Sequence, residues 1–395
     1  MKRVVDLFAG CGGLSLGFQN AGFDIVGAFE WWNIAADCYE ANFTHPVYRD
    51  DLSDVECAIG KVSALRPEVI IGGPPCQEFS HAGKRIEDKR AALTEVFAKI
   101  VTAISPIWFV MENVDRAHKS EAYSTARAIF QAAGYGLTEL ILTSSYCGVP
   151  QRRKRFFCIG SLNSRDEFLT QYILANMSAT EMSLRDYFGN SLGFEYYYRH
   201  PRNYCRRAVY SIDEPSATIR GVNRPVPRGY PGHPNDACEI NDSIRAMTTL
   251  ERALIQTFPP NFKWSGNKTE AEQMIGNAVP VKLAEFVANA LLHHISISAD
   301  TQQPISSVSC VDYSLFREWL RRINTMSERA QRDTLSRLRR ADSICTLPPE
   351  PEAYYVFTLE QSSEYKKLKN DVRSQLKRAV TLYSDYCRAA SIANG

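Results

Sequence analysis

The sequence lacks paired cysteines, long apolar runs and a secretory leader. None of its 11 cysteines forms a Cys-x-x-Cys pair, and their number is odd, which excludes a disulfide framework and a zinc ribbon. Free thiols are typical of a reducing cytosol. No apolar stretch approaches the roughly 20 residues that span a bilayer, and the N-terminus runs directly into a predicted strand. We therefore expect a cytoplasmic protein with no membrane partner and no metal.

The sequence also lacks an excess of charge of one sign. Its formal net charge is +2 over 395 residues, so charge alone identifies no class of partner. The charge is unevenly distributed, because from Thr301 onward Lys and Arg outnumber Asp and Glu by 15 to 11. The chain is long enough for two or three domains, and the C-terminal part is the more basic one.

The N-terminal residues predict a strand, a glycine turn and a helix, in that order. The turn reads DLFAGCGG at 6–13, and a second predicted strand over 25–29 ends in Glu30 and Trp31. Glycines let a ligand approach the backbone, and an acid roughly 20 residues later accepts hydrogen bonds from ribose hydroxyls. The spacing differs from G-x-G-x-x-G, which argues against NAD. Glycines that serve only the turn are the alternative.

A second glycine turn carries a cysteine. The apolar run 69–71 ends in GGPPC at 72–76. The glycines let the backbone turn and the prolines stiffen it, so the thiol of Cys76 lies where open α/β sheets bind ligands. A buried, inert cysteine is the alternative. The polar residues 77–92 predict either a mobile lid or a solvated surface loop.

Charged side chains follow at two further strands. Glu112 comes directly after five apolar residues, 107–111, so desolvation is expected to raise its pKa. The polar residues beside it fit a helix cap equally well. The run QRRKR at 151–155 begins another strand, in which alternation would point Arg153 and Arg155 to the same side. A solvated charged face is the alternative.

Regular alternation of helix and strand lapses between about 161 and 243. Aromatic and basic residues interleave there, as in YYYRHPRNY at 196–204. Such residues stack on bases and contact phosphates in nucleic-acid-binding proteins, but they also occur in ordinary loop-rich domains. Helical character resumes at 249–257, and a polar linker over 296–309 precedes a separate helical module.

Taken in order, these motifs resemble those of the DNA (cytosine-5)-methyltransferases. The series is DLFAG at 6–10, EW at 30–31, GPPCQ at 73–77, ENV at 112–114, QRRKR at 151–155, the stretch 245–259 and GNAV at 276–279. The resemblance covers residues 2 to about 295. Glu78 and His81 depart from the small or apolar residues that are usual in the family, and no catalytic group is missing.

The resemblance implies a pocket for S-adenosylmethionine. Glu30 would hold the ribose, Trp31 would stack on the adenine and Asp51 would meet the adenine amino group. The full set of implied pocket residues is Phe8, Gly10, Gly12, Glu30, Trp31, Asp51, Pro74, Leu93 and Asn277. The helix after Asn277 would return to pack beside the first motif.

The resemblance also implies covalent catalysis on cytosine in a specific duplex DNA sequence. Cys76 would add to C6 of a flipped-out base, Glu112 would act at N3, and Arg153 or Arg155 would hold O2. A cognate restriction endonuclease would belong to the same system without forming a stable complex, and we expect a monomer. A tRNA methyltransferase and a catalytically idle nucleic-acid-binding protein of the same fold are the alternatives.

The implied fold is α/β, a Rossmann-like methyltransferase sheet with helices on both faces. Residues 1–160 and 245–300 would form the catalytic domain, and 161–244 a smaller, irregular target-recognition domain. Residues 301–395 would form a helical extension. That extension could stabilise the fold, pack on a partner, or make an auxiliary DNA contact.

Overall fold

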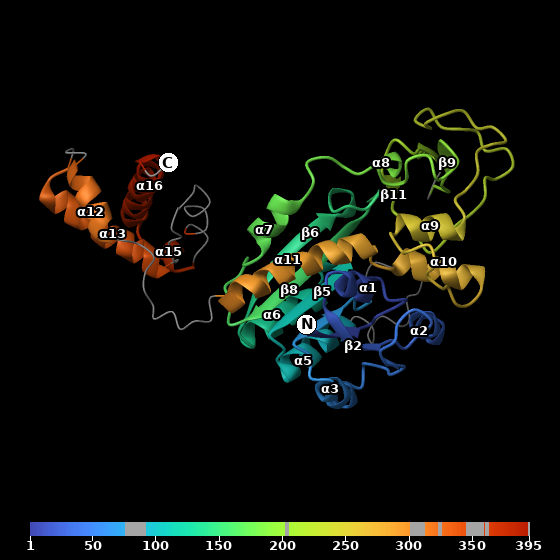
Figure 1. The fold of residues 1–395 in the computed structure, drawn as a ribbon, viewed down its shortest axis with the longest axis horizontal. Coiled ribbons are helices and arrows are strands. Elements are labelled where there is room, and N and C mark those ends of the chain that lie inside the picture. Colours follow the sequence, from blue (N-terminus) through green and yellow to red (C-terminus); the bar gives the residue numbers. More distant parts are fainter. Residues whose placement is uncertain are drawn as a thin grey trace. The chain divides into compact units, whose positions relative to one another are not determined.

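The structure is a computed structural model that describes residues 1–75, 92–201, 205–300, 313–322, 326–344, 359 and 363–393. The chain divides into two compact units, Met1–Ser298 and Ala299–Gly395 (Figure 1).

A seven-stranded, mostly parallel sheet forms the centre of the first unit. Its strand order is β3-β2-β1-β4-β5-β8-β6, and β8 runs antiparallel to both of its neighbours. The strands are β1 (Arg3–Leu7), β2 (Asp24–Phe29), β3 (Val47–Tyr48), β4 (Val69–Gly72), β5 (Trp108–Val114), β6 (Tyr135–Thr143) and β8 (Lys154–Leu162). The order reverses between β1 and β4, which is the point where open α/β sheets bind ligands.

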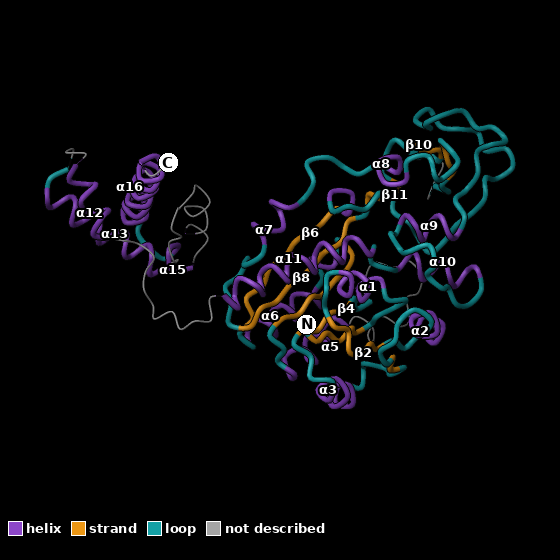
Figure 2. The backbone as a smooth tube through the Cα atoms, viewed as in Figure 1, coloured by secondary structure: helices purple, strands orange, loops and turns teal. Residues whose placement is uncertain are grey.

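Helices cover both faces of this sheet, as the sequence predicted. Successive residues of a strand point to opposite faces, so Val4 and Val5 of β1 belong to two different hydrophobic cores. One core includes α1 (Gly13–Asn20), α7 (Thr170–Asn176) and α11 (Val281–Asp300), and the other includes α3 (Val55–Ala64), α5 (Ala92–Ile104) and α6 (Glu121–Ala132). Figure 2 shows the strands between these helices. Three more short helices lie between the strands β2 and β8 along the chain, namely α2 (Asn33–Glu40), η1 (Ala117–Lys119) and η2 (Ser144–Tyr146).

Helix α11 packs beside the first motif. Gly17 of α1 allows the close approach, because an added Cβ would overlap the Cβ of Ala284. Leu14 and Phe18 share a buried core with Leu283. The predicted return of the helix after Asn277 is therefore confirmed.

The stretch Lys268–Ile297, which includes most of α11, is long and apolar enough to cross a membrane by length and composition. However, 61% of its 18-residue window is buried inside the protein. Pro280 separates the two helices of this stretch, and Val287 and Leu291 lie in the core of the sheet. Burial in that core accounts for the apolar composition.

The predicted domain boundary after Gly160 falls inside a strand. β8 continues to Leu162, and Leu169 and Ile173 near and within α7 are buried in the same core as β1. Residues 161 to about 177 therefore pack with the main sheet. The sequence did not indicate this, because α7 is only seven residues long and follows a charged turn.

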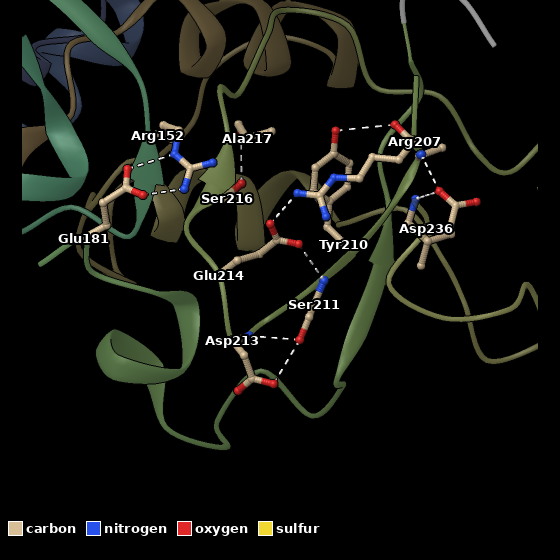
Figure 3. A network of polar contacts seen from close by, with 12 residues as sticks. Arg152, Glu181, Arg207, Tyr210, Ser211, Asp213, Glu214, Ser216, Ala217 and Asp236 are labelled. Carbon is tan, nitrogen blue, oxygen red and sulfur yellow. Dashed lines mark hydrogen bonds and ion pairs between the residues drawn. The ribbon is translucent and has the colours of Figure 1, made fainter. Parts of the chain in front are cut away.

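Between α7 and α11 the chain contains little regular structure. Its elements are α8 (Leu184–Phe188), β9 (Tyr196–Tyr198), β10 (Val209–Ser211), β11 (Ser216–Ala217), α9 (Thr249–Ile255) and α10 (Lys268–Asn277), and β11 pairs with β7 (Gln151–Arg152). Carboxylates satisfy backbone donors here (Figure 3). Asp236 Oδ1 accepts the N–H groups of Ala208 at 2.7 Å and Val209 at 2.9 Å, and Glu214 pairs with Arg207. Such contacts stabilise the conformation of a segment in which few backbone groups pair in β-sheets.

The second unit is helical and has a core of its own, which confirms the predicted C-terminal helical extension. Its helices are α12 (Tyr313–Arg322), α13 (Glu328–Ile344), α15 (Ser363–Lys366) and α16 (Asn370–Ala393). Phe316, Leu338 and Leu376 are fully buried among them. The longer helices α12, α13 and α16 contribute apolar residues at helical spacing.

Candidate active site

A cavity of about 900 Å³ opens at the carboxyl ends of β1, β2, β4 and β5. That volume is typical of a site for a small molecule or cofactor. The predicted site residues that line it are Phe8, Gly10, Glu30, Trp31, Asp51, Pro74, Leu93, Glu112, Arg155 and Asn277. Gly12 and Arg153 are not among the lining residues, and Cys76 lies outside the described residues.

The carboxylate of Glu30 is held at the end of β2 by two backbone donors. Its Oε2 accepts the N–H of Gly10 at 2.7 Å, and its Oε1 accepts the N–H of Trp32 at 2.7 Å. Burial raises the pKa of Glu30, and these hydrogen bonds oppose that shift. Each oxygen keeps a second lone pair for a hydroxyl donor. Next to it Trp31 is 62% exposed, so its ring face is available to a ligand.

Asp6 also lines the cavity, although the sequence did not single it out. Its Oδ2 accepts a hydrogen bond from the Ser15 hydroxyl at 2.6 Å, whereas the buried Oδ1 has no hydrogen-bond partner among the described residues. Burial raises the pKa of Asp6 to about 7. The signal available in the sequence was a carboxylate at the end of a buried strand, immediately before the glycine turn. A cationic ligand group would satisfy the remaining oxygen.

The backbone that leads to Cys76 is tied to β5 by a hydrogen bond and passes close to Glu112. The Asn113 side-chain N–H donates to the carbonyl of Pro74 at 3.0 Å. An added Cβ on Gly73 would lie 3.2 Å from Glu112 Oε2, so the loop backbone passes directly beside that carboxylate. These contacts hold the last described residues before Cys76 against Glu112.

Glu112 forms a buried ion pair with Arg155 across two strands. Val114 of β5 lies opposite Arg155 of β8, and Glu112, two residues away, projects to the same side. Glu112 Oε1 lies 2.7 Å from Arg155 Nε, and the side chains are 9% and 12% exposed. Burial raises the pKa of Glu112, while the charges of Arg155 and Arg153 lower it. The cavity therefore contains a carboxyl group whose pKa is raised by burial and a guanidinium that orients it.

The family model for C-5 cytosine-specific DNA methylases matches residues 2–293. The chain belongs to this family. It is 55% identical over 293 residues to the type II methyltransferase M.HindV of Haemophilus influenzae, covering 74% of this chain and 96% of that protein. It is 51% identical over 295 residues to the type II methyltransferase M.HgiDI of Herpetosiphon aurantiacus, covering 74% and 95%. The fold resembles that of the S. pombe Dnmt2 methyltransferase, with a TM-score of 0.56 at 19% identity over 74% of this chain and 99% of that one.

In this methylase Gly12 serves the turn and not the cavity wall. Its φ is +93°, in the left-handed region that favours glycine, and an added Cβ would overlap the ring of Phe43. The family resemblance assigned it to the cofactor pocket. Close packing of the turn against Phe43, which follows α2, requires a glycine at this position.

Arg153 has a different set of partners from Arg155. Its guanidinium is buried and donates to three carbonyls, those of Ile219 at 2.9 Å, Gly276 at 2.8 Å and Ala278 at 3.1 Å. Arg153 lies between β7 and β8, and its charge acts on Glu112 together with that of Arg155, although the hydrogen-bond partners of the two guanidiniums differ. These contacts make Arg153 a residue that positions backbone around the cavity rather than one that lines it.

A second buried guanidinium, that of Arg252, forms an ion pair. Arg252 Nη1 lies 3.0 Å from Glu272 Oε2, and both side chains are about 5% exposed or less. Arg252 also donates to the carbonyl of Arg220, and Glu272 accepts from Asn223 at 3.1 Å. The pair thus joins helices α9 and α10 to the segment around Arg220.

We expect Glu272→Ala to lower the free energy of unfolding by about 3–5 kcal/mol, because it leaves the Arg252 charge buried and unpaired. Urea unfolding of the full chain measures this. Lys282→Ala, which breaks the exposed Lys282–Glu285 pair, is the control and should change it by less than about 1 kcal/mol. Equal effects of the two substitutions would show that the buried Arg252–Glu272 pair does not stabilise the fold more than an exposed pair does.

Proposed function

We propose that this chain transfers a methyl group from S-adenosylmethionine to C5 of cytosine in a specific duplex DNA sequence. The observation that carries the proposal is the buried Glu112–Arg155 pair beside the Gly73–Pro74 backbone, at the mouth of a cofactor-sized cavity. Membership of the C-5 cytosine-specific DNA methylase family supports the reaction class.

The cavity fits the chemical groups of S-adenosylmethionine. The free lone pairs of Glu30 suit the ribose hydroxyls, and the exposed face of Trp31 suits the adenine ring. The unpartnered Oδ1 of Asp6 suits the positively charged part of the molecule, since a cation nearby favours the charged carboxylate. When bound, the cofactor supplies an electrophilic methyl group.

Trp31→Ala is expected to weaken S-adenosylmethionine binding about tenfold, because stacking on an aromatic side chain contributes roughly 1–3 kcal/mol. Calorimetric titration of the full chain with the cofactor measures the change. Leu250→Ala is a matched control, since Leu250 is 51% exposed and lies outside the cavity. An unchanged Kd for Trp31→Ala would exclude the stacking role.

The chemistry requires a nucleophile, because C5 of cytosine is too weakly nucleophilic to attack a methyl sulfonium unaided. The Cys76 thiolate would add to C6, which makes the electron pair of the C5–C6 double bond available at C5. C5 would then take the methyl group, whose bond to the sulfonium sulfur breaks and leaves a neutral thioether. A base then takes the C5 proton, and elimination releases the Cys76 thiolate. A water molecule suffices as that base.

Glu112 and Arg155 act on the other side of the ring. As the thiolate adds, electron density moves toward N3, where a protonated Glu112 donates a hydrogen bond and stabilises the developing charge. Arg155 orients the Glu112 carboxyl, and its guanidinium would donate a hydrogen bond to O2 of the base. Arg153 contributes by holding the surrounding backbone.

C6 is inaccessible within a stacked duplex, so the target cytosine must leave the helix at a cost of a few kcal/mol. The irregular part between α7 and α9 would select the sequence around it. Because two relatives at more than 50% identity are type II methyltransferases, we assign the chain to a restriction–modification system. It would act as a cytoplasmic monomer, with a cognate endonuclease that makes no stable complex with it.

Transfer of a tritiated methyl group to duplex DNA and to tRNA, compared in one assay, tests the substrate. We expect incorporation into duplex DNA alone. Bisulfite sequencing of DNA from a host that expresses the chain then gives the methylated sequence. Incorporation into tRNA, or into neither substrate, would refute the proposal.

A further inference from the structure

A five-residue turn, 220–224, is held rigidly in the irregular part of the chain. Two buried arginines hold its backbone. Arg252 donates to the Arg220 carbonyl, and Arg153 donates to the carbonyl of Ile219, just before the turn. The Ile219 N–H in turn donates to the Gln151 side chain at 2.8 Å. Buried side chains thus determine the position of this turn, although it contains no helix or strand.

The side chains of the turn point in two directions. Arg220 donates to the His200 carbonyl, and Asn223 donates to the Met247 carbonyl at 2.7 Å and to Glu272, so both are used to anchor the turn. Val222 is 62% exposed. Arg224 is also exposed and has no hydrogen bond or ion pair to any described residue. Two side chains of a fixed turn are therefore free to meet a ligand.

The turn lies directly against the wall of the large cavity. An added Cβ on Gly276 would overlap the backbone nitrogen of Gly221, and Gly276 lines the cavity. The Arg153 guanidinium binds the carbonyls of Ile219 and Gly276 together. The distance between the turn and the site of the flipped base is thus set by buried contacts. A base pair that touches this turn would have a fixed separation from the cytosine.

Positive charge gathers at the same place. Arg199, Arg220 and Arg224 surround a small cavity of about 30 Å³, and their neighbour His200 has a pKa lowered by burial and by the charges of Arg224 and Arg220. The guanidinium of Arg199 is occupied by the Thr218 carbonyl at 2.9 Å. Arg224 is therefore the guanidinium of this group that is free to form new hydrogen bonds.

We propose that Arg224 and Val222 read base edges next to the target cytosine, with Arg224 directed to a guanine and Val222 to an apolar edge such as the thymine methyl group. Arginine pairs in bidentate fashion with O6 and N7 of guanine in the major groove. Such readout requires a fixed backbone, because a guanidinium that is displaced cannot form both hydrogen bonds to the guanine edge. This inference rests on the proposed function and names the residues that select its substrate.

The experiment uses full-length Arg224→Ala, Arg224→Lys and Val222→Ala chains and a duplex library randomised around a cytosine. Bisulfite sequencing gives the base preference at each position. We expect both Arg224 variants to lose preference for guanine at one position by roughly 5- to 150-fold, since lysine keeps the charge but not the bidentate geometry. Val222→Ala should relax preference at a neighbouring position. Cofactor affinity should remain as in the wild type.

Arg228→Ala is the matched control, because Arg228 is also exposed and follows in the same segment. It should leave the base preferences unchanged. An Arg224→Ala chain with wild-type preferences would overturn the inference. So would a uniform loss of methylation on all sequences that lysine restores, because that pattern marks a phosphate contact. A wild-type chain that methylates no sequence would instead refute the proposed function, and this inference with it.

Discussion

Replacing Cys76 with alanine is expected to abolish methyl transfer while leaving DNA and cofactor binding intact. Without the thiolate no bond forms at C6, so C5 never becomes nucleophilic enough to take the methyl group. The rate should fall by a factor on the order of 10⁴ or more, as is typical when a covalent nucleophile is removed. Single-turnover transfer of a tritiated methyl group measures it, and filter binding follows the DNA affinity.

Cys57→Ala is the matched control, since Cys57 is an exposed thiol on α3 outside the cavity. It should transfer methyl groups at the wild-type rate. A duplex that contains 5-fluorocytosine provides a second readout. Fluorine cannot leave C5 as a proton would, so the wild-type chain should remain covalently attached and Cys76→Ala should not. Methyl transfer by Cys76→Ala close to the wild-type rate would exclude the covalent mechanism.

Glu112→Gln is expected to slow single-turnover methyl transfer by about 10²–10⁴, which is the usual contribution of a positioned acid. Burial raises the pKa of Glu112, and the protonated form is the one that donates to N3. The wild-type rate should therefore fall as pH rises through that pKa. Glutamine cannot titrate, so the variant should lose this alkaline limb and keep its cofactor affinity.

Glu68→Gln is the control for this substitution. Glu68 precedes β4 at the opposite end of the sheet and pairs with Lys2 at 2.7 Å. Its variant should show the wild-type rate and the wild-type pH profile. If Glu112→Gln kept both, Glu112 would have no part in the reaction, and the ion pair with Arg155 would be structural only.

The motifs allowed much of the site to be predicted from the sequence. Glu30, Pro74 and Glu112 each follow an apolar run, and in a parallel sheet the residues after such runs meet at one edge. Helical periodicity predicted the C-terminal helical part, and the family resemblance implied helices on both faces of the sheet. Local pattern sufficed for these features because strand and helix periods are properties of the chain itself.

Other features depend on contacts between distant segments. The boundary at 160 was placed where the pattern became irregular, although Leu169 and Ile173 are buried under the sheet. The buried carboxyl of Asp6 was overlooked, because its missing partner is visible only once Ser15 and the surrounding cavity are in place. No local rule reports whether a polar atom that is buried in the fold finds a hydrogen bond.

The amino-acid sequence by itself determined the family and the α/β sheet, and it predicted Glu112 and Arg155 at the ligand-binding edge, where the structure has them. Only the tertiary structure decided that Arg155 meets Glu112 whereas Arg153 binds the carbonyls of Ile219 and Gly276. The physical reason is that a guanidinium is directed by the acceptors around it, and those acceptors come from segments 66 and 123 residues away along the chain.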